Sequence, residues 1–279
     1  MMALPRSTMW REAAKLAAFL RRDLLVTLSY RFAFVSDVAN LVAQTFMFFF
    51  VGLLVDQRKM PSFGGTQASY MAFVVVGIAV SAFLQVGLGR MVYAIRNEQL
   101  MGTLESLFMT PTSETTILFG LVVYDLLYVP IRTLVFLGLV AALFGVDLNL
   151  AGMGPTTLVL ALFIPFVWGL GAATAAAVVR FRSVPGLIGL GGYALAATSG
   201  AYFPLNLLPG WLGDLARYNP VAIALHGARG ALLGGVGWAG VLPDVLLLAP
   251  MAGVSLVVGM LSFRLALRWE RRSGTLGIY

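Results

Sequence analysis

The chain has 279 residues, of which 59% are hydrophobic and only 11% are charged, and its mean hydropathy is +0.90. Soluble domains carry about 25% charged residues, so this composition excludes an ordinary soluble protein and predicts a membrane protein. There is no cysteine and only one histidine, His226, which excludes disulfides, thiolate metal sites and a histidine-based metal cluster or catalytic triad. We therefore predict no metal site and no catalytic residue.

The region before the first long apolar run, residues 1–32, has the pattern of an amphipathic helix. Its apolar residues at three- and four-residue steps are Ala13, Leu16, Leu20 and Leu24. Lys15 and Arg22 lie on a different face, and a basic helix with an apolar face is typical of the membrane–water interface. We predict an interface helix, either a simple anchor for the first span or a helix that also contacts a partner protein.

Six apolar segments are long enough to cross a membrane, since a span needs about 20 residues at 1.5 Å per residue. They comprise residues 33–55, 68–90, 114–144, 156–179, 184–201 and 243–263. The fifth is short and rich in glycine. We therefore predict an all-α polytopic membrane protein with six transmembrane helices in one domain, residues 33–272, followed by a cytoplasmic tail at 273–279.

The basic residues predict the orientation of these spans. With both termini in the cytoplasm, most of the 19 Lys and Arg residues fall on the cytoplasmic side, and only Arg132 falls within a span. Lys and Arg are retained on the cytoplasmic side of membranes, so this orientation is favoured over its inverse. The net charge of +7 thus reflects topology, and we predict a multi-pass plasma-membrane protein that does not bind nucleic acid.

Several enzymatic motifs are missing from the sequence. The two lysines, Lys15 and Lys59, lie in AAKLA and QRKMP, so the phosphate-binding loop G-x-x-x-x-G-K-[ST] is absent. Neither G-x-S-x-G nor H-E-x-x-H occurs. The chain is therefore predicted not to hydrolyse ATP by the P-loop route and not to be an enzyme.

Residues 96–110, between the second and third predicted spans, are polar yet keep the spacing of a helix. We place its N-cap at Asn97, whose side chain accepts a hydrogen bond from the first turn. The helix is expected to end just before Pro111, because the residue before a proline is disfavoured in the α region. Thr110 would then cap the next helix, with Pro111 as its first residue.

One face of this predicted helix is apolar and another is acidic. Leu100, Leu104 and Leu107 follow at i, i+4 and i+7, and Glu98 and Glu105 are seven residues apart. The apolar stripe either docks against another protein or packs on the ends of neighbouring helices. A short helix joined stiffly to two spans can transmit a displacement into the membrane, which a flexible loop does not.

The first and third predicted spans carry polar residues at helical spacing. They are Asp37, Asn40 and Gln44 in the first span and Asp125, Tyr128 and Arg132 in the third. A charge at mid-bilayer costs about 2.5–3.5 kcal/mol, so these groups are expected to face protein or water. They either line a substrate path or clamp helices together. For Asp125 with Arg132, bridged by Tyr128, we predict the clamp; for Asp37, snorkelling to the interface is a third alternative.

Residues 202–242 lie outside the membrane in this topology but are too apolar for a free loop. Three prolines divide the segment into short helices, and a tryptophan is placed like an interfacial anchor; these residues are Pro204, Pro209, Pro220 and Trp211. We predict a re-entrant hairpin buried in protein, as irregular backbone at membrane depth must be. His226 shares a predicted helical face with Arg229, and we interpret it as a hydrogen-bonded structural residue.

Two stretches carry a resemblance to a known family. NEQLMGTLESLFMTP, residues 97–111, looks like the segment between the second and third spans of ABC exporter permeases of the type-2 class. FPLNLLPGWLGDLARYNP, residues 203–220, is similar to the extracellular re-entrant region of that class, and Asn219 closes it before Pro220. The class includes drug, polysaccharide and lipid-linked glycan exporters. The resemblance extends over nearly the whole chain.

The resemblance implies that residues 96–110 form the coupling helix, which docks on a separate ATP-binding subunit. The residues implied to form or support this surface are Glu98, Gly102, Leu104, Glu105 and Leu107. ATP and Mg would be bound by that partner, and no cofactor by this chain. The resemblance further implies a dimer of permeases in the bacterial plasma membrane. The expected cargo is amphipathic: a drug, a lipid or a lipid-linked saccharide.

A different class of protein also fits part of the pattern. An ion-gradient-driven secondary transporter would use Asp37 or Asp125 to carry protons and would need no ATPase. The sequence shows no internal repeat, and a patterned helix between spans has no role in such a transporter. Both features favour the exporter.

Overall fold

The computed structural model describes residues 6–181 and 185–273. Among them the regular secondary structure is helical apart from one short antiparallel hairpin, formed by β1 (Ser62–Phe63) and β2 (Thr66–Gln67). Gly64 and Gly65 turn the hairpin with φ angles of 56° and 83°, which glycine adopts without a steric cost. The chain is an all-α polytopic membrane protein, as its composition predicts.

Five helical segments are long and apolar enough to cross a membrane. They are Phe32–Gly52, Tyr70–Leu100, Glu114–Phe144, Leu150–Phe181 and Trp238–Glu270. The helices that form them are α2 (Arg31–Gly52), α3 (Tyr70–Leu100), α5 (Glu114–Gly120) with α6 (Asp125–Phe144), α7 (Met153–Phe181) and α11 (Trp238–Ser273). These segments match five of the six predicted spans.

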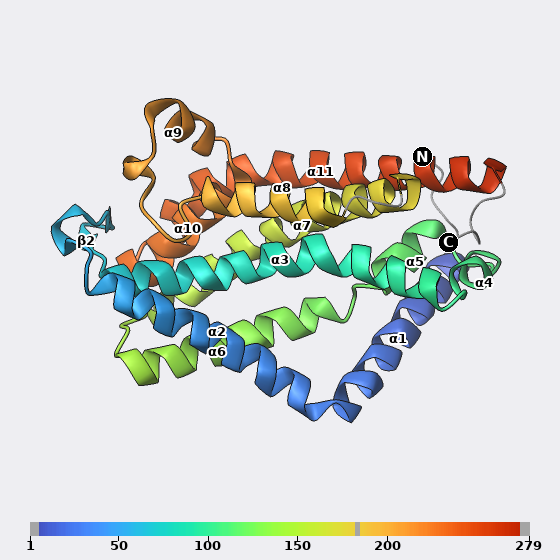
Figure 1. The fold of residues 1–279 in the computed structure, drawn as a ribbon, viewed down its shortest axis with the longest axis horizontal. Coiled ribbons are helices and arrows are strands. Elements are labelled where there is room, and N and C mark those ends of the chain that lie inside the picture. Colours follow the sequence, from blue (N-terminus) through green and yellow to red (C-terminus); the bar gives the residue numbers. More distant parts are fainter. Residues whose placement is uncertain (1–5, 182–184, 274–279) are drawn as a thin grey trace.

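The predicted fifth span, residues 184–201, corresponds to α8 (Pro185–Ala197), with residue 184 outside the described part of the chain. α8 has 13 residues and therefore extends about 20 Å, less than the roughly 30 Å hydrocarbon core. It lies alongside α3 (Figure 1). The structure thus supports five of the six predicted spans, and α8 is shorter than the predicted fifth span.

The long helices run side by side and give the molecule two ends (Figure 1). The first, here called the α4 end, holds the start of α1 (Arg6–Ser29), α4 (Leu104–Phe108) and the end of α11. The opposite end, here called the α9 end, holds the β-hairpin, the single turns η1 (Gln57–Lys59), η2 (Leu150–Gly152) and η3 (Leu205–Leu207), α9 (Gly210–Ala216) and α10 (Pro220–Gly234). Of the predicted tail 273–279, only Ser273 is described, and it ends α11.

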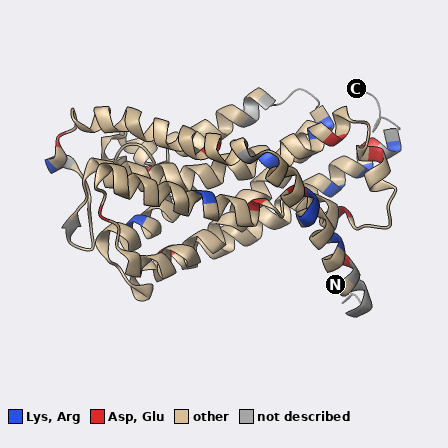
Figure 2. Ribbon diagram, turned by 90° about the horizontal axis from the view of Figure 1, so that it is seen from below, with Lys and Arg blue, Asp and Glu red and all other residues tan. Residues whose placement is uncertain are grey.

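Charge is distributed unevenly between the two ends. Lys and Arg residues gather toward the α4 end, and few lie along the helices between the ends (Figure 2). A membrane-crossing region with few charges is the arrangement that the cost of charge in hydrocarbon favours. The long axis of the helices is therefore the axis along which the protein crosses the membrane.

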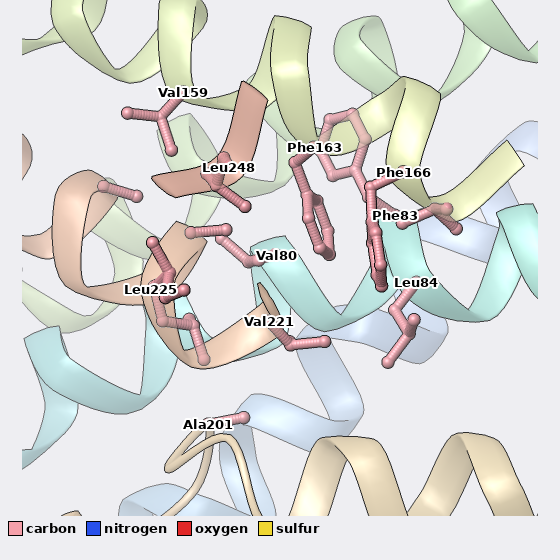
Figure 3. Packing of buried hydrophobic residues seen from close by; sticks show 14 of the residues in the cluster. Val80, Phe83, Leu84, Val159, Phe163, Phe166, Ala201, Val221, Leu225 and Leu248 are labelled. Carbon is pink, nitrogen blue, oxygen red and sulfur yellow. The ribbon is translucent and has the colours of Figure 1, made fainter. Parts of the chain in front are cut away.

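α3 is the central helix, and α2 is peripheral. In the most apolar window of α3, 83% of the residues are buried, against 11% for α2. The largest core cluster joins α3 to α7, α10 and α11 and includes Phe83, Phe163 and Leu248 (Figure 3). A second cluster lies at the α4 end and a third toward the α9 end.

Glycine allows two of these contacts to be very close. A Cβ atom on Gly77 of α3 would lie 1.9 Å from the Ala201 carbonyl oxygen, and one on Gly259 of α11 would lie 2.1 Å from the Gly169 carbonyl oxygen of α7. Small residues let helix backbones approach in membranes, where packing replaces the hydrophobic effect as the main attraction. α7 and α11 therefore form one tightly packed pair.

Candidate functional site

The helix predicted over residues 96–110 is interrupted at Gly102. This residue has a φ of 68°, a left-handed conformation that ends α3. The Thr103 N–H donates to the Glu98 carbonyl oxygen at 3.0 Å, a bond typical of a helix C-terminus closed by glycine. The prediction of one continuous helix is wrong, because the left-handed glycine separates the last turn of α3 from the five-residue α4.

The predicted caps of this segment are also wrong. Asn97 lies inside the last turns of α3 rather than at a helix start. The next helix, α5, is capped by Ser113, whose hydroxyl accepts from the Thr116 N–H at 3.0 Å, and not by Thr110. Pro111 lies in the connection between α4 and α5. The boundaries shift because a serine with extended backbone is available nearer to the start of α5.

Leu104 anchors α4 in the interior of the molecule. Its side chain is 1% exposed and belongs to the cluster at the α4 end, with Met91, Phe263 and Leu267. Leu107 is half-buried against the same cluster. A displacement of α4 therefore acts on α3 and α5, which it contacts, and through the shared cluster on α11.

The remaining part of the predicted stripe faces outward. Leu100 is 69% exposed, because the break at Gly102 turns it away from Leu104. Met109 and Glu105 are exposed as well. α4 thus packs inward through two leucines and presents an acidic and apolar surface on the outside.

α1 is fastened to this region by charged side chains. Arg22 donates to Glu98 at 3.3 Å, and Glu98 also accepts a hydrogen bond from the Thr103 hydroxyl. Lys15 donates to Glu12 and to the Pro111 carbonyl oxygen, both at 2.6 Å. The Lys15 ammonium holds the pKa of Glu12 below its usual value. Glu98 is therefore a joint between α1 and the end of α3.

The polar residues of the first and third spans form an interhelical contact. Asp37 of α2 accepts a hydrogen bond from the Tyr128 hydroxyl and pairs with Arg132 Nη1 at 3.6 Å, both from α6. The Arg132 guanidinium also lies 5.7 Å from the centre of the Tyr128 ring. Asn40 is exposed and Gln44 half-buried. The predicted bridge of Tyr128 between Asp125 and Arg132 is wrong, because the Tyr128 hydroxyl donates to Asp37 of the neighbouring helix.

Asp125 pairs with Arg90 of α3, so the predicted pairing of Asp125 with Arg132 is wrong. Arg90 Nε donates to both carboxylate oxygens of Asp125, at 3.1 and 3.2 Å. Asp125 is 6% exposed, whereas the Arg90 side chain is 45% exposed. The pair lines a cleft whose other walls include Trp168 of α7. It is a clamp between helices, with one charge reaching the surface.

The Arg90–Asp125 pair lies where the third span changes its winding. Between α5 and α6 the backbone forms i→i+3 hydrogen bonds, such as Asp125 N–H to the Val122 carbonyl oxygen at 3.0 Å. Pro130 follows one turn later and supplies no N–H. A tightened stretch inside a long helix often marks a hinge. The ion pair thus joins the third span to α3 beside this tightened stretch.

The region predicted to be re-entrant consists of η3, α9 and α10 at the α9 end. Pro204 and Pro209 precede the first two elements, and Pro220 begins α10. Asn219 caps α10, its side chain accepting from the Val221 N–H at 2.9 Å while its amide donates to the Leu195 carbonyl oxygen of α8 at 2.9 Å. The predicted anchor Trp211 is 67% exposed.

Arg229 of α10 is a buried cation that the sequence pattern did not single out. It is 4% exposed and donates to the carbonyl oxygens of Phe73, Gly200 and Ala201 at 2.9–3.2 Å. Its guanidinium also lies 3.4 Å from the centre of the Phe73 ring. One side chain thereby joins α10, the start of α3 and the segment after α8.

His226 lies three residues before Arg229 on α10, but 70% of its side chain is exposed, whereas Arg229 is buried. The His226 Nδ1 contacts the Asp244 carboxylate of α11 at 3.0 Å. The hydrogen bond to Asp244 raises the pKa of His226. The interpretation of His226 as a hydrogen-bonded structural residue fits this geometry.

The Arg90 and Arg229 contacts were missed because both partners are distant in sequence. A signal existed for Arg90: it lies ten residues before the end of α3, and Asp125 lies eleven residues after the start of the next span. Two antiparallel helices bring such positions to the same depth. Arg229 bonds to backbone carbonyls, which no side-chain pattern reports.

The fold and these contacts define a class of protein. It is a helical multi-pass membrane protein with a short anchored helix at one end, intramembrane ion pairs and a folded cap at the other end. Among the described residues, no three or more His, Asp or Glu side chains are arranged to hold a metal ion.

A comparison with protein families identifies the class more closely. The profile of the family described as ABC-2 type transporter matches residues 15–233. The chain belongs to the ABC-2 type transporter family, so it is a membrane permease component without an ATPase site of its own. A comparison with curated proteins found no match.

Proposed function

We propose that the chain is the permease subunit of an exporter energised by a separate ATP-binding subunit that docks on α4. In this proposal the partner binds ATP and Mg, and a second permease copy completes the pathway in a bacterial plasma membrane. The observation that carries it is the double character of α4. Leu104 is buried in the core, while Glu105 and Met109 are exposed on the outside.

The coupling step follows from these contacts. An ATP-binding subunit that moves α4 also moves Leu104, and Leu104 packs against side chains of α3, α5 and α11. Protein interiors are close-packed and transmit displacement. The hinge between α5 and α6 lies directly along this route. Of the residues first expected at the docking surface, we assign Glu105 to docking, Leu104 and Leu107 to anchoring, and Glu98 and Gly102 to shaping the end of α3.

Six spans remain our proposal, with α8 as the fifth crossing. α7 ends at the α4 end and α9 lies at the opposite end, so α8 and the residues next to it return the chain along the molecule (Figure 1). An even number of crossings leaves α1 and the end of α11 on one side. The concentration of Lys and Arg near the α4 end supports a cytoplasmic location for that side.

An amphipathic cargo fits the surfaces between the spans. The groove between α2 and α6 is lined by apolar side chains that include Val38, Val42 and Leu139. The charged residues nearby, Asp37 and Arg132, are paired with each other rather than presented to a hydrated ion. We propose a drug, lipid or lipid-linked saccharide as cargo, exported between two permease copies.

The rival secondary transporter has less support. Asp37 is paired with Arg132 and Asp125 with Arg90. Proton uptake by either carboxylate would break an ion pair and leave an arginine uncompensated near the membrane interior, which is costly. Nothing in that mechanism uses the exposed surface of α4.

The docking proposal is tested with a surface variant that leaves the core untouched. Glu105→Arg combined with Met109→Asp changes two exposed residues of the proposed surface. The permease is co-expressed with an ABC ATP-binding subunit of the same genome that co-purifies with the unmodified chain, and co-purification and ATP-dependent transport are measured. We expect both to be lost while the melting temperature stays unchanged, because a charge reversal at an interface costs several kcal/mol.

The matched control is Asp214→Arg, an equally exposed charge reversal at the α9 end. It should leave assembly and transport intact. Normal assembly and transport by the α4 variant would exclude docking at this surface. Full transport by the permease alone in vesicles with an ion gradient would establish the rival mechanism instead.

A further inference from the structure

A long groove runs along the closely packed pair of α7 and α11. Two cavities lie end to end between these helices and share Ala173 as a wall. One reaches Arg180 and Trp269 at the α4 end, and the other reaches Phe166 and Pro250 toward the α9 end. We call the whole feature the α7–α11 groove.

The deep part of the groove accepts only apolar groups. Ser255 contributes the one polar side chain among the described residues that line the inner cavity, and its hydroxyl donates to the Phe166 carbonyl oxygen at 2.7 Å. The donor of this hydroxyl is therefore already used. A polar ligand placed here would lose its hydrogen bonds to water without replacement, which is unfavourable. A hydrocarbon chain meets no such cost.

The mouth of the groove is cationic. The Arg180 guanidinium stacks on Trp269, 4.3 Å from the centre of the ring, and lies next to Phe181 as well. Stacking uses the face of the guanidinium, and its N–H donors point outward in its plane. Arg180 is exposed, so these donors are accessible to an anion such as a phosphate.

The dimensions match one leaflet of a bilayer. Fourteen residues separate Phe166 from Arg180, a distance of about 21 Å along a helix. An acyl chain occupies half of a hydrocarbon core about 30 Å thick, so it fits within this length. Trp269 lies at the mouth beside Arg180, and tryptophan is the residue typical of the headgroup level. The mouth therefore lies where a phospholipid phosphate lies.

We propose that the α7–α11 groove binds one anionic glycerophospholipid of the leaflet at the α4 end. Its phosphate contacts Arg180, and one acyl chain fills the groove past Ala173. Because Gly169 and Gly259 leave α7 and α11 in backbone contact beneath it, the lipid covers this helix pair without separating it. This lipid is a bound structural partner and is distinct from the cargo.

The proposal is tested with the full-length chain in detergent, using phosphatidylglycerol and phosphatidylcholine with identical acyl chains. Lipids retained per chain are counted by native mass spectrometry, and the melting temperature is measured during lipid titration. We expect phosphatidylglycerol to bind more tightly. Arg180→Gln should weaken its binding about fivefold, whereas Arg180→Lys should retain the preference for the anionic lipid.

Groove-filling variants test the second half of the proposal. Ala173→Phe, or the milder Ala177→Leu, should abolish retention of the lipid. The matched controls are Ala161→Phe, exposed on α7 outside the groove, and Arg268→Gln, exposed on α11. Both should bind phosphatidylglycerol as the unmodified chain does.

Three results would overturn the proposal. The first is equal affinity of the unmodified chain for the two lipids. The second is unchanged binding of phosphatidylglycerol by Arg180→Gln or by both groove-filling variants. The third is displacement of the lipid by inorganic phosphate alone at equal concentration, which would show that the acyl chain contributes nothing.

Discussion

Different kinds of contact stabilise each of the two ends of the molecule. At the α4 end, one buried leucine anchors α4, and the half-exposed Arg22 joins α1 to Glu98. At the α9 end, the buried Arg229 donates to three backbone carbonyl groups. Exposed ion pairs contribute little and exchange readily with water, whereas buried charged hydrogen bonds are costly to break.

This difference separates a mobile end from a rigid one. α4 can shift about Leu104 while its surface contacts rearrange, but α10 cannot leave α3 without exposing unpaired groups. The end proposed to receive the ATP-binding subunit is therefore the end whose contacts are easier to change. Four measurements test this difference between the two ends.

The largest effect is expected for Arg229→Ala. The substitution leaves the carbonyl groups of Phe73, Gly200 and Ala201 without their donor, at about 1–3 kcal/mol for each buried group. We expect the free energy of unfolding in detergent to fall by about 4 kcal/mol. Arg217→Ala, at a 79% exposed position at the same end, should cost less than about 0.5 kcal/mol. Equal losses would contradict the rigid α9 end.

Leu104→Ala should come next. It removes a side chain that is 1% exposed and leaves a cavity, so unfolding should become easier by about 3 kcal/mol. Leu100→Ala is the control, because that side chain is 69% exposed and should change stability by less than about 0.5 kcal/mol. Denaturant titration of the two variants compares them directly. If Leu104→Ala left the free energy of unfolding unchanged, Leu104 would not anchor α4 and the proposed coupling route would lose its first contact.

Asp125→Asn should have an intermediate effect. The substitution removes the carboxylate that pairs with Arg90. Because Arg90 is 45% exposed, water can solvate its charge. We therefore expect the free energy of unfolding to fall by about 2 kcal/mol, less than for a fully buried pair. A double-mutant cycle with Arg90→Gln should yield a coupling of about 1 kcal/mol. Additive single effects would mean that the two residues act independently.

The smallest effect is expected from the His226–Asp244 pair. The hydrogen bond to Asp244 raises the pKa of His226 above 6.5, so the protonated ring stabilises the fold fully below that pH. This contribution is lost as the pH rises through the raised pKa. Because the ring is largely exposed, we expect protonated His226 to stabilise the fold by about 0.5 kcal/mol. Melting curves of the unmodified chain and His226→Gln should therefore converge at alkaline pH, and Asp244→Asn should remove the dependence.

Local sequence patterns predict the membrane class, five of the spans and the segment that contains α4. Each depends on a local property: the length of an apolar run, the spacing of leucines or the position of a proline. Gly102 was visible in that segment, and its break could have been anticipated, since glycine is the usual residue at a left-handed helix end. The family resemblance also follows from short stretches of chain.

Which charged residues form ion pairs depends on the tertiary structure. Asp125 could pair with Arg132 two turns away on its own helix, yet its partner is Arg90 on α3. Arg132 pairs with Asp37 instead, and Arg229 with carbonyl groups far along the chain. A charge inside a membrane takes the partner that packing brings to its depth and orientation. Helix spacing specifies neither, because both depend on how separate helices cross.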